Sequence, residues 1–217
     1  MAKQILRILV LVAAASPLNL AAEPQQHSRL FRPEELGMLE GPDRDAWQRP
    51  DQVMDALNIA EGSVVADLGA GGGWFTIRLA SRVGPNGVVY AEDVQPQMIE
   101  AITRRTARAQ LQKIVKPVLG TASDPRLPAP VDAALFVDAY HEMQQRVVML
   151  GNVARMLKPG GRIGIIEFKK DGWGPGPPMD ERMDPERIIR DAEAAGLRLL
   201  SRETFLRYQY MLVFTRR

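Results

Sequence analysis

The sequence has 217 residues, contains no cysteine and has only two histidines, His27 and His141. Without thiols the chain forms no disulfide, holds no zinc–thiolate site and uses no cysteine nucleophile. The absence of cysteine fits an oxidising compartment without demonstrating one. Because the two histidines are far apart and no carboxylate pattern accompanies them, we predict no metal site.

A hydrophobic run long enough to cross a membrane is also missing. Lys3 and Arg7 precede the uncharged stretch Ile8–Ala15, and the small residues Ala21 and Ala22 follow. A membrane span needs about 20 apolar residues, whereas this pattern is typical of a secretory signal peptide. We therefore predict a signal peptide over residues 1–22 and a periplasmic or exported protein. An uncleaved membrane anchor and an ordinary N-terminal helix are the alternatives.

The chain after residue 22 has no excess of positive charge. Residues 1–22 carry two of the 28 basic residues and none of the 26 acidic ones, so the remaining chain is formally neutral. A neutral domain gives no electrostatic case for nucleic acid. We expect contact with a membrane only through an uncleaved N-terminal segment.

The most informative stretch that is present runs from Val64 to Thr76. It begins as a short apolar run that predicts a buried strand, continues through closely spaced glycines, and resumes with helical spacing. A strand, a glycine turn and a helix bring backbone N–H groups up to a ligand. The spacing is not that of a dinucleotide fingerprint, because Trp74 stands where a third glycine is needed, and no phosphate-loop lysine follows. Asp67, at the strand end, suits a cationic ligand better than a pyrophosphate.

The following residues alternate strand and helix patterns, which predicts a parallel α/β sheet. We divide the chain into the signal peptide, a helical segment over residues 23–60 that covers the site, and a domain over residues 61–217. In the helical segment, Trp47 either lines a substrate pocket or packs the segment onto the domain. The Gly- and Pro-rich stretch Lys169–Met183 is either a connector or a lid over the site. Strands are predicted at Val64–Asp67, Val88–Glu92, Val115–Leu119, Val131–Val137, Arg162–Phe168, Leu197–Glu203 and Tyr208–Thr215. Helices are predicted at Gln52–Leu57, Trp74–Val83, Pro96–Gln110, Glu142–Leu157 and Pro185–Ala195.

Three motifs in order carry a family resemblance. Asp67–Gly73 reads D-L-G-A-G-G-G, Val89–Val94 ends a strand on acids, and Leu157–Arg162 reads L-K-P-G-G-R, after the lead Arg44–Pro50. From about Trp47 onward, the chain resembles the class I S-adenosylmethionine (SAM) dependent methyltransferases. Within that class it resembles small bacterial members related to quinone-biosynthesis methyltransferases. The resemblance implies a Rossmann-like fold, with a seven-stranded, mostly parallel sheet, helices on both faces and the last strand antiparallel. It also implies SAM as the cofactor.

The resemblance assigns cofactor-binding roles to particular residues. Asp67 would lie near the positive groups of SAM, and Asp93 would accept hydrogen bonds from both ribose hydroxyls. Glu92 is an alternative by one position, but strand alternation points it to the other face. The methionine part of SAM would approach the backbone of three glycines closely: Gly69, Gly71 and Gly73.

Three further residues belong to the predicted site. Asp124 either contacts adenine or caps the turn before Pro125. Asp138 would lie near the cofactor. His141 is either the general base for an acceptor hydroxyl or amine, or a structural residue that caps the next helix. We therefore predict methyl transfer to an unidentified small or lipophilic acceptor; the alternative is a non-catalytic SAM- or nucleoside-binding protein of the cell envelope.

Overall fold

The computed structural model describes residues 30–171 and 174–217. The predicted signal peptide, residues 1–22, and His27 lie outside the described residues. Every helix in the described part of the chain is too short or too polar to span a bilayer.

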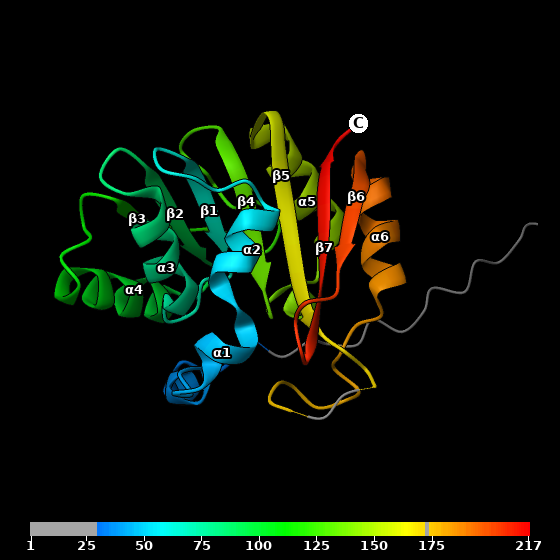
Figure 1. Cartoon of the computed structure of the whole chain (residues 1–217), viewed down its shortest axis with the longest axis horizontal. Helices are drawn as coiled ribbons and strands as arrows, with labels where there is room; N and C mark the ends of the chain where they lie inside the picture. The colour runs from blue at the N-terminus through cyan, green and yellow to red at the C-terminus, as the bar shows by residue number, and fades with distance from the viewer. Residues whose placement is uncertain (1–29, 172–173) are drawn as a thin grey trace, which may run out of the picture.

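A seven-stranded sheet forms the centre of the molecule (Figure 1). Its strand order is β3-β2-β1-β4-β5-β7-β6, with parallel pairing from β3 to β5 and with β7 antiparallel to both of its neighbours. This arrangement confirms the predicted fold, including the antiparallel last strand. The strands are β1 (Val64–Leu68), β2 (Val88–Asp93), β3 (Val115–Leu119), β4 (Val131–Val137), β5 (Leu157–Phe168), β6 (Leu197–Glu203) and β7 (Gln209–Arg216).

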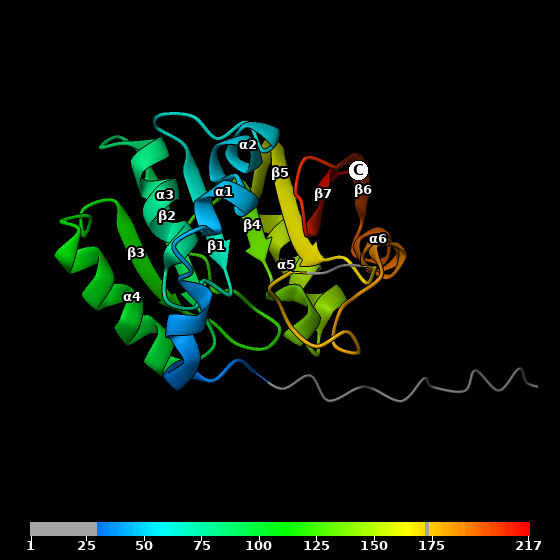
Figure 2. The same cartoon turned by 60° about the horizontal axis from the view of Figure 1, so that its bottom comes forward.

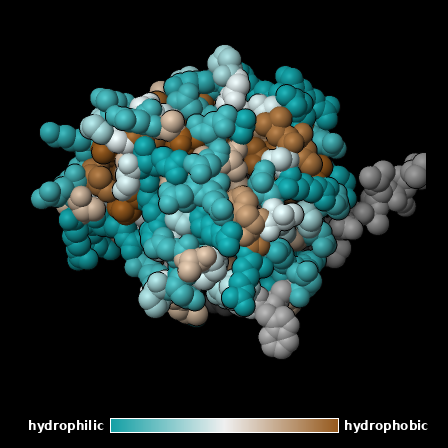
Figure 3. Space-filling view, in the orientation of Figure 1, coloured by the Kyte–Doolittle hydropathy of each residue, from teal (hydrophilic) through white to brown (hydrophobic). Residues whose placement is uncertain are grey.

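Helices cover both faces of the sheet because the buried strands are apolar on both sides. Val65 belongs to the core cluster under α2 and α3, whereas its neighbour Ala66 belongs to the cluster under α5 and α6. The surface over α2 and α3 is mostly hydrophilic, with hydrophobic side chains in separate patches (Figure 3). The α-helices are α1 (Arg44–Gln48), α2 (Pro50–Ala56), α3 (Trp74–Val83), α4 (Pro96–Arg108), α5 (Arg146–Met156) and α6 (Pro185–Ala194), and the 3-10 helices are Pro33–Leu39 and Tyr140–Glu142.

Two element boundaries differ from the prediction by more than two residues. The helix predicted from Glu142 begins at Arg146, because the chain first makes a short 3-10 turn and is extended at Met143. The strand predicted from Arg162 begins at Leu157, which pairs with β4 ahead of a register shift. The Lys-Pro-Gly-Gly motif therefore lies within an irregular strand rather than before it.

Two segments cover the edge of the sheet where the parallel strands end (Figure 2). One is the N-terminal segment up to α2, and the other is the Gly/Pro-rich loop between β5 and α6. The buried side chain of Arg182 holds this loop, donating hydrogen bonds to the carbonyl oxygens of Lys169 at 2.9 Å and Pro177 at 3.0 Å. Since β7 is antiparallel, the C-terminal Arg217 lies at the opposite edge of the sheet.

Candidate functional site

A cavity of about 540 Å³ opens at the carboxyl edge of the parallel strands. Its walls come from the glycine loop after β1, the ends of β2 and β4, the N-terminal segment and the loop that Arg182 holds. This volume lies within the range of roughly 300–1,000 Å³ that small-molecule sites occupy. The cavity therefore lies where open α/β sheets bind their ligands.

The backbone of the glycine loop packs tightly against the end of β4. Gly69 has a φ of +68°, and a Cβ added to it would lie 2.6 Å from the Cβ of Ala139. Gly71 also lines the cavity, whereas Gly73 begins α3 behind it. Only a residue without a side chain fits at position 69, so the loop comes close to the strand ends and leaves room above it for a ligand.

We expect Gly69→Ala to destabilise the protein by about 2–5 kcal/mol, because it adds overpacking to an unfavourable left-handed backbone. Gly62→Ala is the matched control, since Gly62 has a φ of +79° but nothing within 4 Å of an added Cβ. The control should cost only about 1–2 kcal/mol for its backbone conformation. Urea unfolding of both variants measures the difference, and equal losses would show that the contact with Ala139 relaxes.

Two adjacent acids at the end of β2 hold the glycine loop. Asp93 accepts hydrogen bonds from the backbone N–H groups of Gly71 at 3.0 Å and Gln95 at 2.9 Å. Glu92 accepts one from the N–H of Gly69 at 3.3 Å, and both acids line the cavity. The prediction that Glu92 points away from the site is therefore wrong: its long side chain turns to the loop N–H. Burial raises the pKa of Glu92 to about 8, with a smaller contribution from Asp93.

Asp67 lies at the base of the cavity, whereas Asp124 does not line it. The buried carboxylate of Asp67 accepts a 2.6 Å hydrogen bond from Thr76, and burial raises its pKa to about 6. The exposed carboxylate of Asp124 instead accepts a hydrogen bond from the N–H of Arg126 at 2.8 Å. The structure thus gives Asp124 the turn-capping role, and the cavity wall after β3 is formed by Thr121 and Ala122.

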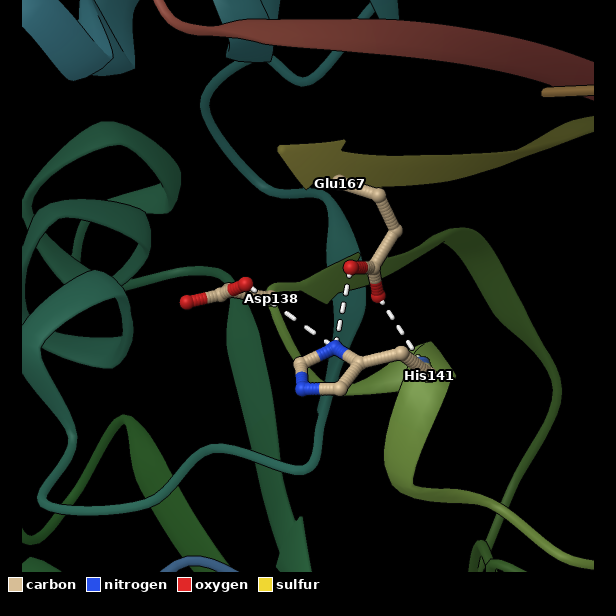
Figure 4. Close-up of side chains that lie close together, drawn as sticks. All are labelled: Asp138, His141 and Glu167. Carbon is tan, nitrogen blue, oxygen red and sulfur yellow. Dashed lines mark hydrogen bonds and ion pairs between the residues drawn. The ribbon is translucent and has the colours of Figure 1, made fainter. Parts of the chain in front are cut away.

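His141 is held by a buried carboxylate that the sequence analysis did not identify. Glu167, on β5, accepts hydrogen bonds from the backbone N–H of His141 at 3.0 Å and from its ring Nδ1 at 2.9 Å (Figure 4). Glu167 is fully buried, while His141 lines the cavity. With Nδ1 bonded to Glu167, the ring directs its other nitrogen, Nε2, away from that carboxylate.

The charges around His141 shift several pKa values. Burial lowers the pKa of His141, but the charge and hydrogen bond of Glu167 outweigh it and raise the pKa to about 9. Burial and the neighbouring Glu167 raise the pKa of Asp138 to about 7. Burial also raises the pKa of Glu142 to about 7, against a hydrogen bond from the N–H of Phe31. This end of the cavity can therefore take up and release protons near neutral pH.

Asp138, His141 and Glu167 place potential metal-ligand atoms within 4.8 Å of one another. This group is not apparent in the sequence, because Glu167 is 26 residues beyond His141. Both carboxylate oxygens of Glu167 already accept hydrogen bonds from His141. The geometry is that of a carboxylate orienting an imidazole, and the absence of a metal stays a prediction.

The N-terminal segment contributes Arg44 to the cavity wall, another residue that the sequence analysis did not single out. Its guanidinium lies 4.2 Å from the centre of the Trp74 ring. Trp47, by contrast, lies outside the cavity wall and packs against Phe168 and Tyr208, with ring centroids 6.0 Å apart in each pair. Of the two roles considered for Trp47, the structure shows the packing role.

Part of the chain matches a domain of known type. Residues 65–161 match the family model described as a methyltransferase domain. An uncharacterized methyltransferase of Mycobacterium tuberculosis is 38% identical over 128 residues, which make up 57% of this chain and 49% of that protein. The ubiquinone/menaquinone biosynthesis C-methyltransferase of Pasteurella multocida is 30% identical over 132 residues, 57% of this chain and 46% of that protein. The chain thus spans about half the length of these curated relatives.

A solved structure matches over a larger share of the chain. The SAM-dependent methyltransferase from Aquifex aeolicus is 26% identical, with a TM-score of 0.79 over 85% of this chain and 98% of its own. The likeness therefore extends beyond the matched domain, over most of the fold described above.

Proposed function

From the premise that this chain carries the domain and fold of a SAM-dependent methyltransferase, we propose that it transfers a methyl group to a small or lipophilic acceptor. The observation that carries the proposal is the His141–Glu167 pair, which lies at the same cavity as the glycine loop. The pair supports the proposal because His141 could then accept a proton beside the proposed cofactor site.

The described residues fit SAM as the cofactor. The glycine loop forms a cradle at the cavity wall, where Gly69 passes so close to Ala139 that an added Cβ would lie 2.6 Å from the Cβ of Ala139. Acids line that cradle, which suits the sulfonium and ammonium of SAM. Asp93 stands at the end of β2, where its carboxylate would accept both ribose hydroxyls. When bound, SAM supplies an electrophilic methyl group on its sulfur.

The residues of this chain would orient the acceptor and remove its proton. The cavity walls hold the acceptor in line with the methyl group, and such positioning supplies much of the rate in a displacement reaction. His141 takes the acceptor proton on Nε2, while Glu167 fixes the ring through Nδ1 and stabilises the imidazolium that forms. With its pKa at about 9, His141 must first lose its own proton, so we expect the rate to increase with pH through this range.

The experiment that tests the proposal has two stages. The first is a calorimetric titration of residues 23–217 and of the full chain with SAM, S-adenosylhomocysteine and NAD. We expect binding of the first two ligands in the range of roughly 1 μM–1 mM typical of KM values, and none of NAD. No binding of either adenosyl ligand would contradict the proposed function.

The second stage measures the formation of S-adenosylhomocysteine with a panel of phenols, hydroquinones and amines, with and without EDTA. Turnover that persists in EDTA supports a metal-free reaction, whereas loss that Mg²⁺ restores would make Asp138, His141 and Glu167 a metal site. Binding without turnover of any acceptor would favour the non-catalytic alternative.

We propose export from the cytoplasm on the sequence pattern of residues 1–22 alone. The N-terminal residue of the protein purified from its native host tests this, because cleavage would leave Glu23 or Ala22 first.

A further inference from the structure

Arg44 is held rigidly at the wall of the cavity. Its guanidinium stacks on Trp74, and its Nε donates a 3.1 Å hydrogen bond to the side-chain oxygen of Gln48. Gln48 in turn donates to the side-chain oxygen of Gln209, on β7, at 2.6 Å. Both glutamines are buried. A cation fixed in this way loses little conformational freedom when it binds an anion, so the site is preorganised.

The cavity wall also carries several acids. Asp67, Glu92, Asp93 and Asp138 all line the cavity, and Oδ1 of Asp138 is buried without a hydrogen-bond partner. These acids suit the positive groups of SAM, but its methionine part also carries a carboxylate. That carboxylate would be repelled by the acids unless a cation faces it.

Among the described residues of the wall, Arg44 is the cation best suited to this task. Arg32 also lines the cavity, but its side chain is 58% exposed and forms an ion pair with Glu35. His141 is engaged by Glu167. The planar guanidinium of Arg44 can bind both oxygens of a carboxylate at once.

We propose that Arg44 binds the methionine carboxylate of SAM and thereby selects ligands that carry it. The proposal rests on the proposed function for the identity of the cofactor. It makes α1 part of the cofactor site rather than only a cover over it. Burial lowers the pKa of Arg44 to about 10, so the side chain is still charged at neutral pH.

The competing role for Arg44 is that of a counter-ion for Asp138 and Asp67, whose charges both act on it. A counter-ion would affect every adenosyl ligand through the folding of the wall. A carboxylate anchor would affect only ligands that have the carboxylate. The difference between two such ligands therefore separates the roles.

The test is calorimetric titration of the full chain and its variants with S-adenosylhomocysteine and with its decarboxylated analogue, which keeps the amine. In Arg44→Gln we expect the affinity for S-adenosylhomocysteine to fall about 10- to 100-fold, as for a lost hydrogen-bonded charge pair. The affinity for the analogue should change less than about threefold or increase, because a cation near its amine is removed.

Arg78→Gln is the matched control. The guanidinium of Arg78 lies 3.4 Å from the centre of the same Trp74 ring, but Arg78 pairs with Asp45 and does not line the cavity. This control should preserve the affinity ratio of the two ligands. Arg44→Lys, which keeps the charge but not the two-pronged geometry, should give an intermediate ratio.

An unchanged ratio in Arg44→Gln would overturn the proposal, whatever happens to the absolute affinities. Should Arg44→Gln fail to fold in a thermal melt, the ratio in Arg44→Lys decides the question. If the unaltered protein bound neither ligand, the proposed function itself would fail, and that outcome is distinguishable from an unchanged ratio.

Discussion

Replacing His141 with alanine should lower kcat by about 10²- to 10⁴-fold, the usual contribution of a general base. The affinity for S-adenosylhomocysteine should change little, because our proposal has the ring contact the acceptor rather than the cofactor. Steady-state kinetics with an acceptor identified by the panel measures the first quantity, and calorimetry measures the second. If kcat survives the change, His141 has only the structural role of capping the turn before α5.

The pH dependence tests the role of Glu167 as the residue that positions His141. A base must be neutral to act, so the rate should increase with pH through the pKa of His141, at about 9. Glu167→Gln removes the charge that raises this pKa and leaves one acceptor oxygen for the two hydrogen bonds from His141, so the rising limb should move to lower pH. The plateau rate should also fall, since the ring loses its fixed orientation. If the rising limb of the pH–rate profile stays at the same pH in this variant, the group that titrates belongs to the acceptor and not to His141.

The second large effect is expected at the end of β2. Asp93→Ala should weaken the binding of S-adenosylhomocysteine by about 10²- to 10³-fold, because the two hydrogen bonds that we propose between the ribose hydroxyls and this carboxylate would be lost. The variant also releases the backbone N–H of Gly71, which Asp93 holds. Calorimetry gives the affinity, and a thermal melt of the free protein separates loss of binding from loss of fold.

Two neighbouring acids serve as controls for Asp93. Asp124→Ala should weaken binding less than about threefold, because this exposed side chain makes only a hydrogen bond within its own turn. Glu92→Gln keeps the size of a side chain that holds the same loop. A larger loss in Asp124→Ala than in Asp93→Ala would contradict our assignment of the ribose contact.

The fold could be predicted because its signals are local. Val115–Leu119, Val131–Val137 and Trp74–Val83 have the bounds that the apolar spacing predicts. The start of α5 at Arg146 could not be read from spacing, since the 3-10 turn before it is set by the contacts of His141 and Glu167.

The parts of the site that sequence analysis missed depend on pairing between distant segments. Glu167 reaches His141 because β4 and β5 are neighbours in register, with Val137 opposite Ile166. The sequence signal for Glu167 is its position as a lone acid in the apolar run before Phe168. Arg44 stands in a recognised lead motif, but nothing local shows that its guanidinium turns inward.

The two ends of the described chain face opposite directions. Leu30 lies at the cavity, whereas the C-terminal Arg217 follows β7 to the far edge of the sheet. A sensor surface or resin coupled at the C-terminus would therefore present the cavity to solution. Coupling near the start of the described chain would bring the same cavity close to the support, so the C-terminus is the better attachment point for measurements on a surface.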